Sequence, residues 1–221
     1  MTRVLAIVHG PDVGPELFAE VLDEEGCEIV EWDIRLNGSP PVEIDAVLVF
    51  GGDQNVGEEL QHPWLHEEYE ALRLYVERGT ALLGVCLGAQ TLAHAFGGVV
   101  SRTETPLAGF YATELTEAGV ADPVLGVLPP TFEAFNANEY RFTIPPGATE
   151  LARGPVPQAF RFGERAWAVQ FHPEIRRANV LTWFDGDSPR PVAEIAAELD
   201  EKLAGWQEHG RLLCRAFLAQ A

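Results

Sequence analysis

The chain has 221 residues, 47% of them hydrophobic, and carries a formal net charge of −19. So acidic a chain repels phosphate backbones and anionic lipids, and we therefore expect no nucleic-acid partner and no membrane-surface partner. Its three cysteines, at positions 27, 86 and 214, are odd in number and widely separated, which argues against a disulfide framework or a zinc-type site.

The first part of the chain alternates between short apolar runs and amphipathic stretches. The runs are typical of strands buried on both faces, and the stretches carry apolar residues at helical spacing. Strands are predicted at residues 4–8, 27–32, 46–50 and 81–85, and helices at residues 15–25, 63–78 and 91–96. The first run is too short for a signal peptide or a membrane span, so we expect a cytoplasmic protein. The alternation predicts an α/β fold with a mostly parallel sheet and helices on both faces.

The pattern changes between about residues 99 and 171. Short strand-like pieces lie between Pro and Gly turns, at residues 111–115, 131–135, 150–152, 158–162 and 167–171. We expect them to extend the sheet in an antiparallel or mixed manner. A helix is predicted at 176–184, a loop at 185–189, and a helical segment at about 190–220 with candidate breaks at Gly205 and Gly210. The simplest organisation is a single domain spanning residues 1–221.

Residues 84–90 join a predicted strand to a helix, and a glycine stands two positions to either side of Cys86. Glycines remove the Cβ clashes of a sharp strand-to-helix turn, and such a turn exposes its central side chain at the sheet edge. A helix N-terminus also favours the negative charge of a thiolate. A cysteine after an apolar run is more often a core thiol. The flanking glycines instead favour Cys86 as a nucleophile, with the Leu87 N–H beside it.

Two other predicted strands end in residues that suit the same chemistry. One ends in Gly51-Gly52 and the other in His172-Pro173-Glu174. If these strands are parallel neighbours of the one before Cys86, all three ends lie at one sheet edge, where sites of open α/β sheets form.

At that edge His172 would take the thiol proton, and Glu174 would orient the imidazole ring. The N–H groups of Gly52 and Leu87 would hold an oxyanion. Taken alone, His172 is equally well explained as a structural histidine and Gly51-Gly52 as a turn, and only their joint occurrence favours catalysis. His9 also follows a predicted strand, but we expect no catalytic role for it.

These motifs resemble those of the class I (triad-type) glutamine amidotransferases, in particular free-standing members similar to the glutaminase of GMP synthase. The similar segments are residues 50–52, 84–90 and 170–174, together with residues 157–163 ahead of the histidine strand. The resemblance implies a flavodoxin-like fold and a catalytic triad of Cys86, His172 and Glu174. It implies hydrolysis of a γ-carboxamide through a γ-glutamyl thioester with release of ammonia, and no cofactor or metal.

By the same resemblance, Gln90 and the turn around Gly52 help to bind glutamine. Two segments depart from the family pattern. Residues 135–139 lack the histidine of a Trp-His-x-Asp-like segment, and residues 107–110 replace a Glu-Ile-Gly-Trp-like one. We expect both segments near the approach of the substrate or a partner.

Three functions remain open. The leading one is a glutaminase-type amidotransferase that supplies ammonia to a separate synthetase or acceptor enzyme, since no synthase domain fits in the remaining length. The second is a γ-glutamyl hydrolase that acts on a γ-glutamyl amine or peptide with the same triad. The third is a catalytically silent regulatory or binding subunit, against which the intact triad argues.

Overall fold

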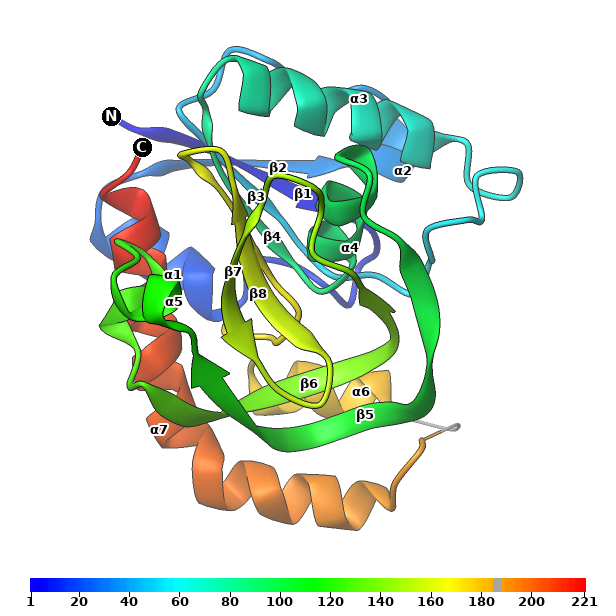
Figure 1. Ribbon diagram of the computed structural model, residues 1–221, viewed down its shortest axis with the longest axis vertical. Coiled ribbons are helices and arrows are strands. Elements are labelled where there is room, and N and C mark those ends of the chain that lie inside the picture. Colours follow the sequence, from blue (N-terminus) through cyan, green and yellow to red (C-terminus); the bar gives the residue numbers. More distant parts are fainter. Residues whose placement is uncertain (185–187) are drawn as a thin grey trace.

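The computed structural model describes residues 1–184 and 188–221, so the predicted loop at 185–189 lies partly outside the described residues. Within these residues, five strands are parallel: β1 (Arg3–Val8), β2 (Glu28–Asp33), β3 (Ala46–Val49), β4 (Ala81–Val85) and β9 (Ala166–Val169). Four form an antiparallel part: β5 (Val100–Leu115), β6 (Thr131–Phe142), β7 (Thr149–Arg153) and β8 (Pro157–Phe162). Together they make one sheet in the order β2-β1-β3-β4-β9-β8-β7-β5-β6 (Figure 1). The predicted parallel sheet with an antiparallel extension is confirmed.

Helices cover both faces of the parallel part. On one face lie α1 (Leu17–Glu24) and α7 (Val192–Leu218), and on the other α3 (Trp64–Glu77) and α4 (Leu87–Ala95). The remaining short helices are α2 (Ile34–Asn37), α5 (Glu117–Val120), the 3-10 turn η1 (Leu125–Val127) and α6 (Arg177–Trp183).

Strand β1 contributes side chains to the two apolar cores that lie on either side of the sheet. Successive side chains of a strand point to opposite faces, so a strand buried on both sides reads as a continuous apolar run. Val4 and Ala6 pack in the same core as Phe18 of α1, whereas Leu5 and Ile7 pack in the core that contains the apolar face of α3.

Two of the predicted strand pieces after residue 99 are too short, whereas the other three coincide closely with β7, β8 and β9. Residues 111–115 and 131–135 belong to β5 and β6, which have 16 and 12 residues and pair with each other. Their pairing shifts register between Arg102 and Leu107, and many of their side chains are exposed. The apolar pattern therefore loses its regular alternation, which hides the true strand lengths.

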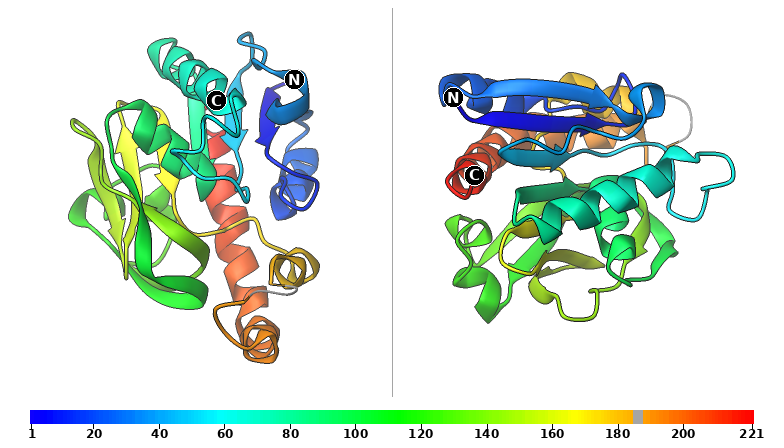
Figure 2. Two further views of the ribbon diagram at one scale, coloured as in Figure 1. Left: turned by 90° about the vertical axis from the view of Figure 1, so that its right-hand side faces the viewer. Right: turned by 90° about the horizontal axis from the view of Figure 1, so that it is seen from above.

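The C-terminal segment differs from its prediction in one respect. Helix α7 is continuous from Val192 to Leu218, so neither Gly205 nor Gly210 interrupts it. Figures 1 and 2 show that it nevertheless changes direction along its length. The short helix α2 was not predicted; Asp33 caps it by accepting a hydrogen bond from the Arg35 N–H.

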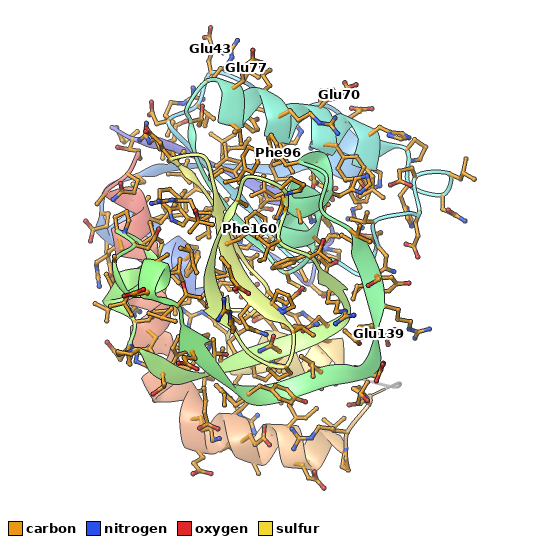
Figure 3. The ribbon with its side chains drawn as sticks, viewed as in Figure 1. Glu43, Glu70, Glu77, Phe96, Glu139 and Phe160 are labelled. Atoms are coloured by element: carbon orange, nitrogen blue, oxygen red, sulfur yellow. The ribbon has the colours of Figure 1, made fainter. Side chains whose placement is uncertain are left out.

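The acidic residues lie mostly on the surface. Glu70 and Glu77 of α3, for example, point outward from the rim of the molecule (Figure 3). Among the described residues, no helix combines the length and apolar character that a membrane crossing requires.

Candidate active site

Cys86 stands at a strained turn between β4 and α4. Its backbone has φ 53° and ψ −105°, a region that residues other than glycine rarely occupy. A Cβ atom on Gly84 would lie 2.4 Å from the Gly88 carbonyl oxygen, and one on Gly88 would lie 2.3 Å from the Val49 carbonyl oxygen. Only glycine permits these approaches, so the two glycines allow the turn to press against the neighbouring strand.

The three strand ends singled out in the sequence meet at one edge. Strand β4 lies between β3 and β9, and all three run parallel. The Cys86 N–H donates to the Val169 carbonyl over 2.9 Å. A Cβ atom on Gly51 would lie 3.2 Å from His172 Cε1 and 3.7 Å from Cys86 Cβ. The ends of β3, β4 and β9 therefore bring the glycine pair, the thiol and the imidazole together.

His172 and Glu174 form a buried pair. His172 Nδ1 lies 2.8 Å from Glu174 Oε1, and both residues are 3% exposed. The second ring nitrogen, Nε2, is buried without a hydrogen-bond partner among the described residues. Burial by itself lowers the pKa of His172, but the charges of Glu174 and of a Cys86 thiolate outweigh burial and raise this pKa to about 10. The site thus favours an imidazolium at His172.

The thiol faces a cavity of about 350 Å³. Gly52, Cys86, Leu87, Gln90 and His172 all line it. The first turn of a helix leaves its N–H groups without intrahelical partners, and Leu87 is the first residue of α4. The cavity therefore brings a thiol, an imidazole and the N–H groups of a helix N-terminus together around one space.

Gln90 is anchored by protein contacts. Its Nε2 donates to the Tyr140 carbonyl over 3.0 Å and to Gln170 Oε1 over 3.3 Å. Both segments that depart from the family pattern contribute to the same cavity, through Leu107 of one and residues 137–139 of the other. They therefore lie where a substrate would be bound.

Three side chains around the site have no role that the sequence predicts. Gln170 Nε2 lies 3.7 Å from Cys86 Sγ, and the Trp183 ring lies 4.9 Å from the His172 ring between centroids. Trp206 of α7 donates from Nε1 to the His172 carbonyl over 2.8 Å. Gln170 was within reach of sequence analysis, because it stands two positions before His172 in the segment 170–174 that resembles the family. The two tryptophans carry no such signal, because they come from distant helices.

The fold and this site define a class of protein, the α/β enzymes with a cysteine nucleophile at a strand-to-helix turn. The family comparison is more specific. Residues 17–179 match the family described as glutamine amidotransferase class-I, and the chain belongs to this family. The predicted resemblance is confirmed, as is the prediction of an enzyme of this type.

Individual relatives agree with the family match. The glutamine-hydrolyzing GMP synthase of Aeropyrum pernix is 34% identical over 177 residues, which are 72% of this chain and 33% of that protein. The chain thus spans about a third of the length of this relative, and the same holds for that of Thermosipho melanesiensis. A solved glutamine amidotransferase from Thermotoga maritima has a TM-score of 0.80 at 24% identity and covers 98% of each chain. One from Methylobacillus flagellatus has a TM-score of 0.85 at 21% identity, covering 99% of this chain and 94% of that one. The two structures establish the shared fold.

Proposed function

We propose that this protein hydrolyses the side-chain amide of glutamine through a γ-glutamyl thioester on Cys86 and releases ammonia. The observation that carries the proposal is the meeting of a thiol at a strained turn with a buried histidine–carboxylate pair at one cavity. Membership of the class I glutamine amidotransferase family supports glutamine as the substrate.

In the first half of the reaction, the Cys86 thiolate attacks the amide carbon of glutamine. The carbonyl oxygen becomes an oxyanion, and the N–H groups of Gly52 and Leu87 donate to it. The C–N bond then breaks, His172 gives its proton to the departing nitrogen, and ammonia leaves. Glu174 holds the imidazole through Nδ1, so that Nε2 faces the reacting atoms.

In the second half, water replaces ammonia in the cavity. His172, now neutral, takes a proton from that water, and the oxygen attacks the thioester carbon. The same two N–H groups hold the second oxyanion. The C–S bond breaks, glutamate leaves, and the thiolate–imidazolium pair is restored.

The pH dependence of this site tests the role of Glu174. Glu174→Gln removes the largest of the charges that raise the pKa of His172, so this pKa falls from about 10. Because the active form needs the imidazolium, the alkaline limb of kcat/KM is expected near pH 10 in the wild type and at lower pH in the variant. Ammonia release measured from pH 5 to 11 checks this, with Glu70→Gln on the exposed side of α3 as the control. A limb that stays in place in Glu174→Gln would refute the assignment.

We also propose that the ammonia passes to a separate acceptor enzyme in the cytoplasm. The Aeropyrum pernix relative is named both as a synthase and as glutamine-hydrolyzing, and this chain matches about a third of it. In this proposal, a partner protein receives the ammonia and carries out the acceptor chemistry. The unpaired state of Cys27, Cys86 and Cys214 suits a reducing compartment.

One observation favours a second candidate, a γ-glutamyl hydrolase that acts on an amine-substituted amide. Asp53 and Glu139 line the cavity, and no Lys or Arg does so within the described part of the chain. Glu139, at the edge of the β5–β6 pair in Figure 3, is paired with Arg102 over 2.6 Å. The Asp53 carboxylate remains available for a cationic substituent on the leaving nitrogen.

A substrate panel separates the two candidates. The pure protein is incubated with glutamine, γ-glutamyl methylamide and γ-glutamyl diamines, and the release of ammonia or amine is followed. Glutamine turnover that exceeds that of every substituted amide is the expected result. Turnover of the diamine derivatives alone would establish the second candidate, and no turnover combined with no labelling of Cys86 by a glutamine-like electrophile would exclude both.

A further inference from the structure

A buried histidine lies directly behind the glycine pair of the site. His9 follows β1 and is 1% exposed, and its Nδ1 lies 2.9 Å from the Gly51 carbonyl oxygen. Its Nε2 lies 2.5 Å from Glu68 Oε2 of α3, and both side chains are fully buried. The Trp64 ring stacks on the imidazole with centroids 5.2 Å apart. His9 does not line the cavity, so it does not touch a substrate there.

The partners of His9 fix where its protons lie. A carbonyl oxygen can only accept, so Nδ1 must carry a proton and donate it to Gly51. Nε2 faces Glu68 Oε2, so one proton lies between these two atoms. Burial lowers the pKa of His9, but the charge of Glu68 and the hydrogen bonds to Glu68 and Gly51 outweigh it and raise that pKa.

The hydrogen bond to Gly51 controls the neighbouring N–H. In a trans peptide the C=O of one residue and the N–H of the next point in opposite directions from one plane. Holding the Gly51 oxygen therefore fixes the direction of the Gly52 N–H. That N–H makes no hydrogen bond within the described residues, and Gly52 lines the cavity beside Leu87. A peptide between two glycines rotates easily, so a hydrogen bond such as the one from His9 is needed to fix its orientation.

We propose that His9, braced by Glu68, is a positioning residue that keeps the peptide between residues 51 and 52 oriented as an oxyanion donor. The inference rests on the proposed function, because the oxyanion arises only in that chemistry. The hydrogen bond that the Gly51 oxygen accepts from His9 also polarises this peptide and strengthens its N–H as a donor.

Two variants of nearly equal shape isolate the hydrogen bond. In His9→Asn, the side-chain NH₂ takes the place of Nδ1–H and still reaches the Gly51 oxygen, whereas His9→Leu has no donor. Both variants lose the contact with Glu68. The effect of this loss is therefore the same in each and does not contribute to the difference in kcat between them. We expect His9→Leu to lower kcat by about 10²–10³ relative to His9→Asn. The KM for glutamine and the rate of Cys86 alkylation by iodoacetamide, a displacement that forms no oxyanion, should stay within about threefold.

Crystal structures of both variants give a readout that does not depend on turnover. The peptide between residues 51 and 52 should keep its orientation in His9→Asn and rotate in His9→Leu. An unrotated peptide in His9→Leu, or equal kcat in the two variants, would overturn the inference. If the wild type turns over no γ-glutamyl amide, the proposed function is wrong. The orientation of the peptide between residues 51 and 52 in the two variants still shows whether His9 fixes that peptide.

Discussion

Cys86→Ala is expected to abolish glutamine hydrolysis without unfolding the protein. No thioester can form without the thiol, and removing the nucleophile of a triad lowers kcat by a factor on the order of 10⁶. Alanine is smaller than cysteine and fits a position that is 7% exposed. The measurement is ammonia release at saturating glutamine, together with a thermal unfolding curve.

Cys27→Ser is the matched control for this variant. It also removes one thiol, but from a half-buried position that is not among the residues lining the cavity. It should retain wild-type turnover. Residual turnover of one part in a hundred in Cys86→Ala would contradict the assignment of Cys86 as nucleophile.

Gly88→Ala is expected to cause a large loss of stability. The added Cβ would lie 2.3 Å from the carbonyl oxygen of Val49 and 2.8 Å from its carbonyl carbon. These are backbone atoms of a central strand, so relief requires β3 and α4 to separate. We expect the free energy of unfolding to fall by about 3–5 kcal/mol, a size typical of severe core strain. For a chain of this length that corresponds to a Tm lower by roughly 6–20 °C.

Gly205→Ala is the matched control, because the same change from glycine to alanine is expected to stabilise the protein at this position. Gly205 lies inside α7, is exposed, and has no heavy atom within 4 Å of an added Cβ. Alanine in a helix interior should raise the free energy of unfolding by about 0.5–1 kcal/mol. Calorimetry on both variants measures the difference. Equal Tm values for Gly88→Ala and wild type would show that the turn can relax, contrary to its tight packing.

The parallel half of the fold and the residues of the site could be predicted because their signals are local. A strand buried on both faces, such as residues 46–50, is a continuous apolar run, and the glycines around Cys86 mark a turn that other residues would not permit. The rule that sites form at the carboxyl ends of parallel strands then brought His172 to the same edge.

The rest depends on contacts between distant parts of the chain. The pairing of β5 with β6 is irregular, so their alternation could not define their lengths. His9 and Glu68 are 59 residues apart, and their contact exists only because β1 and α3 are packed together. Trp206 reaches His172 from a helix outside the matched family region of residues 17–179. No spacing along the sequence reveals such contacts.

The central claim is that Cys86 is the nucleophile toward a glutamine side chain, and labelling tests it most directly. A glutamine analogue with a chloromethyl ketone in place of the amide forms a thioether with a thiolate and releases chloride. Intact-protein mass spectrometry should show one adduct on the wild type, located by proteolysis to Cys86, none on Cys86→Ala, and protection by excess glutamine. An unlabelled wild type, or an adduct on Cys27 or Cys214, would contradict the account.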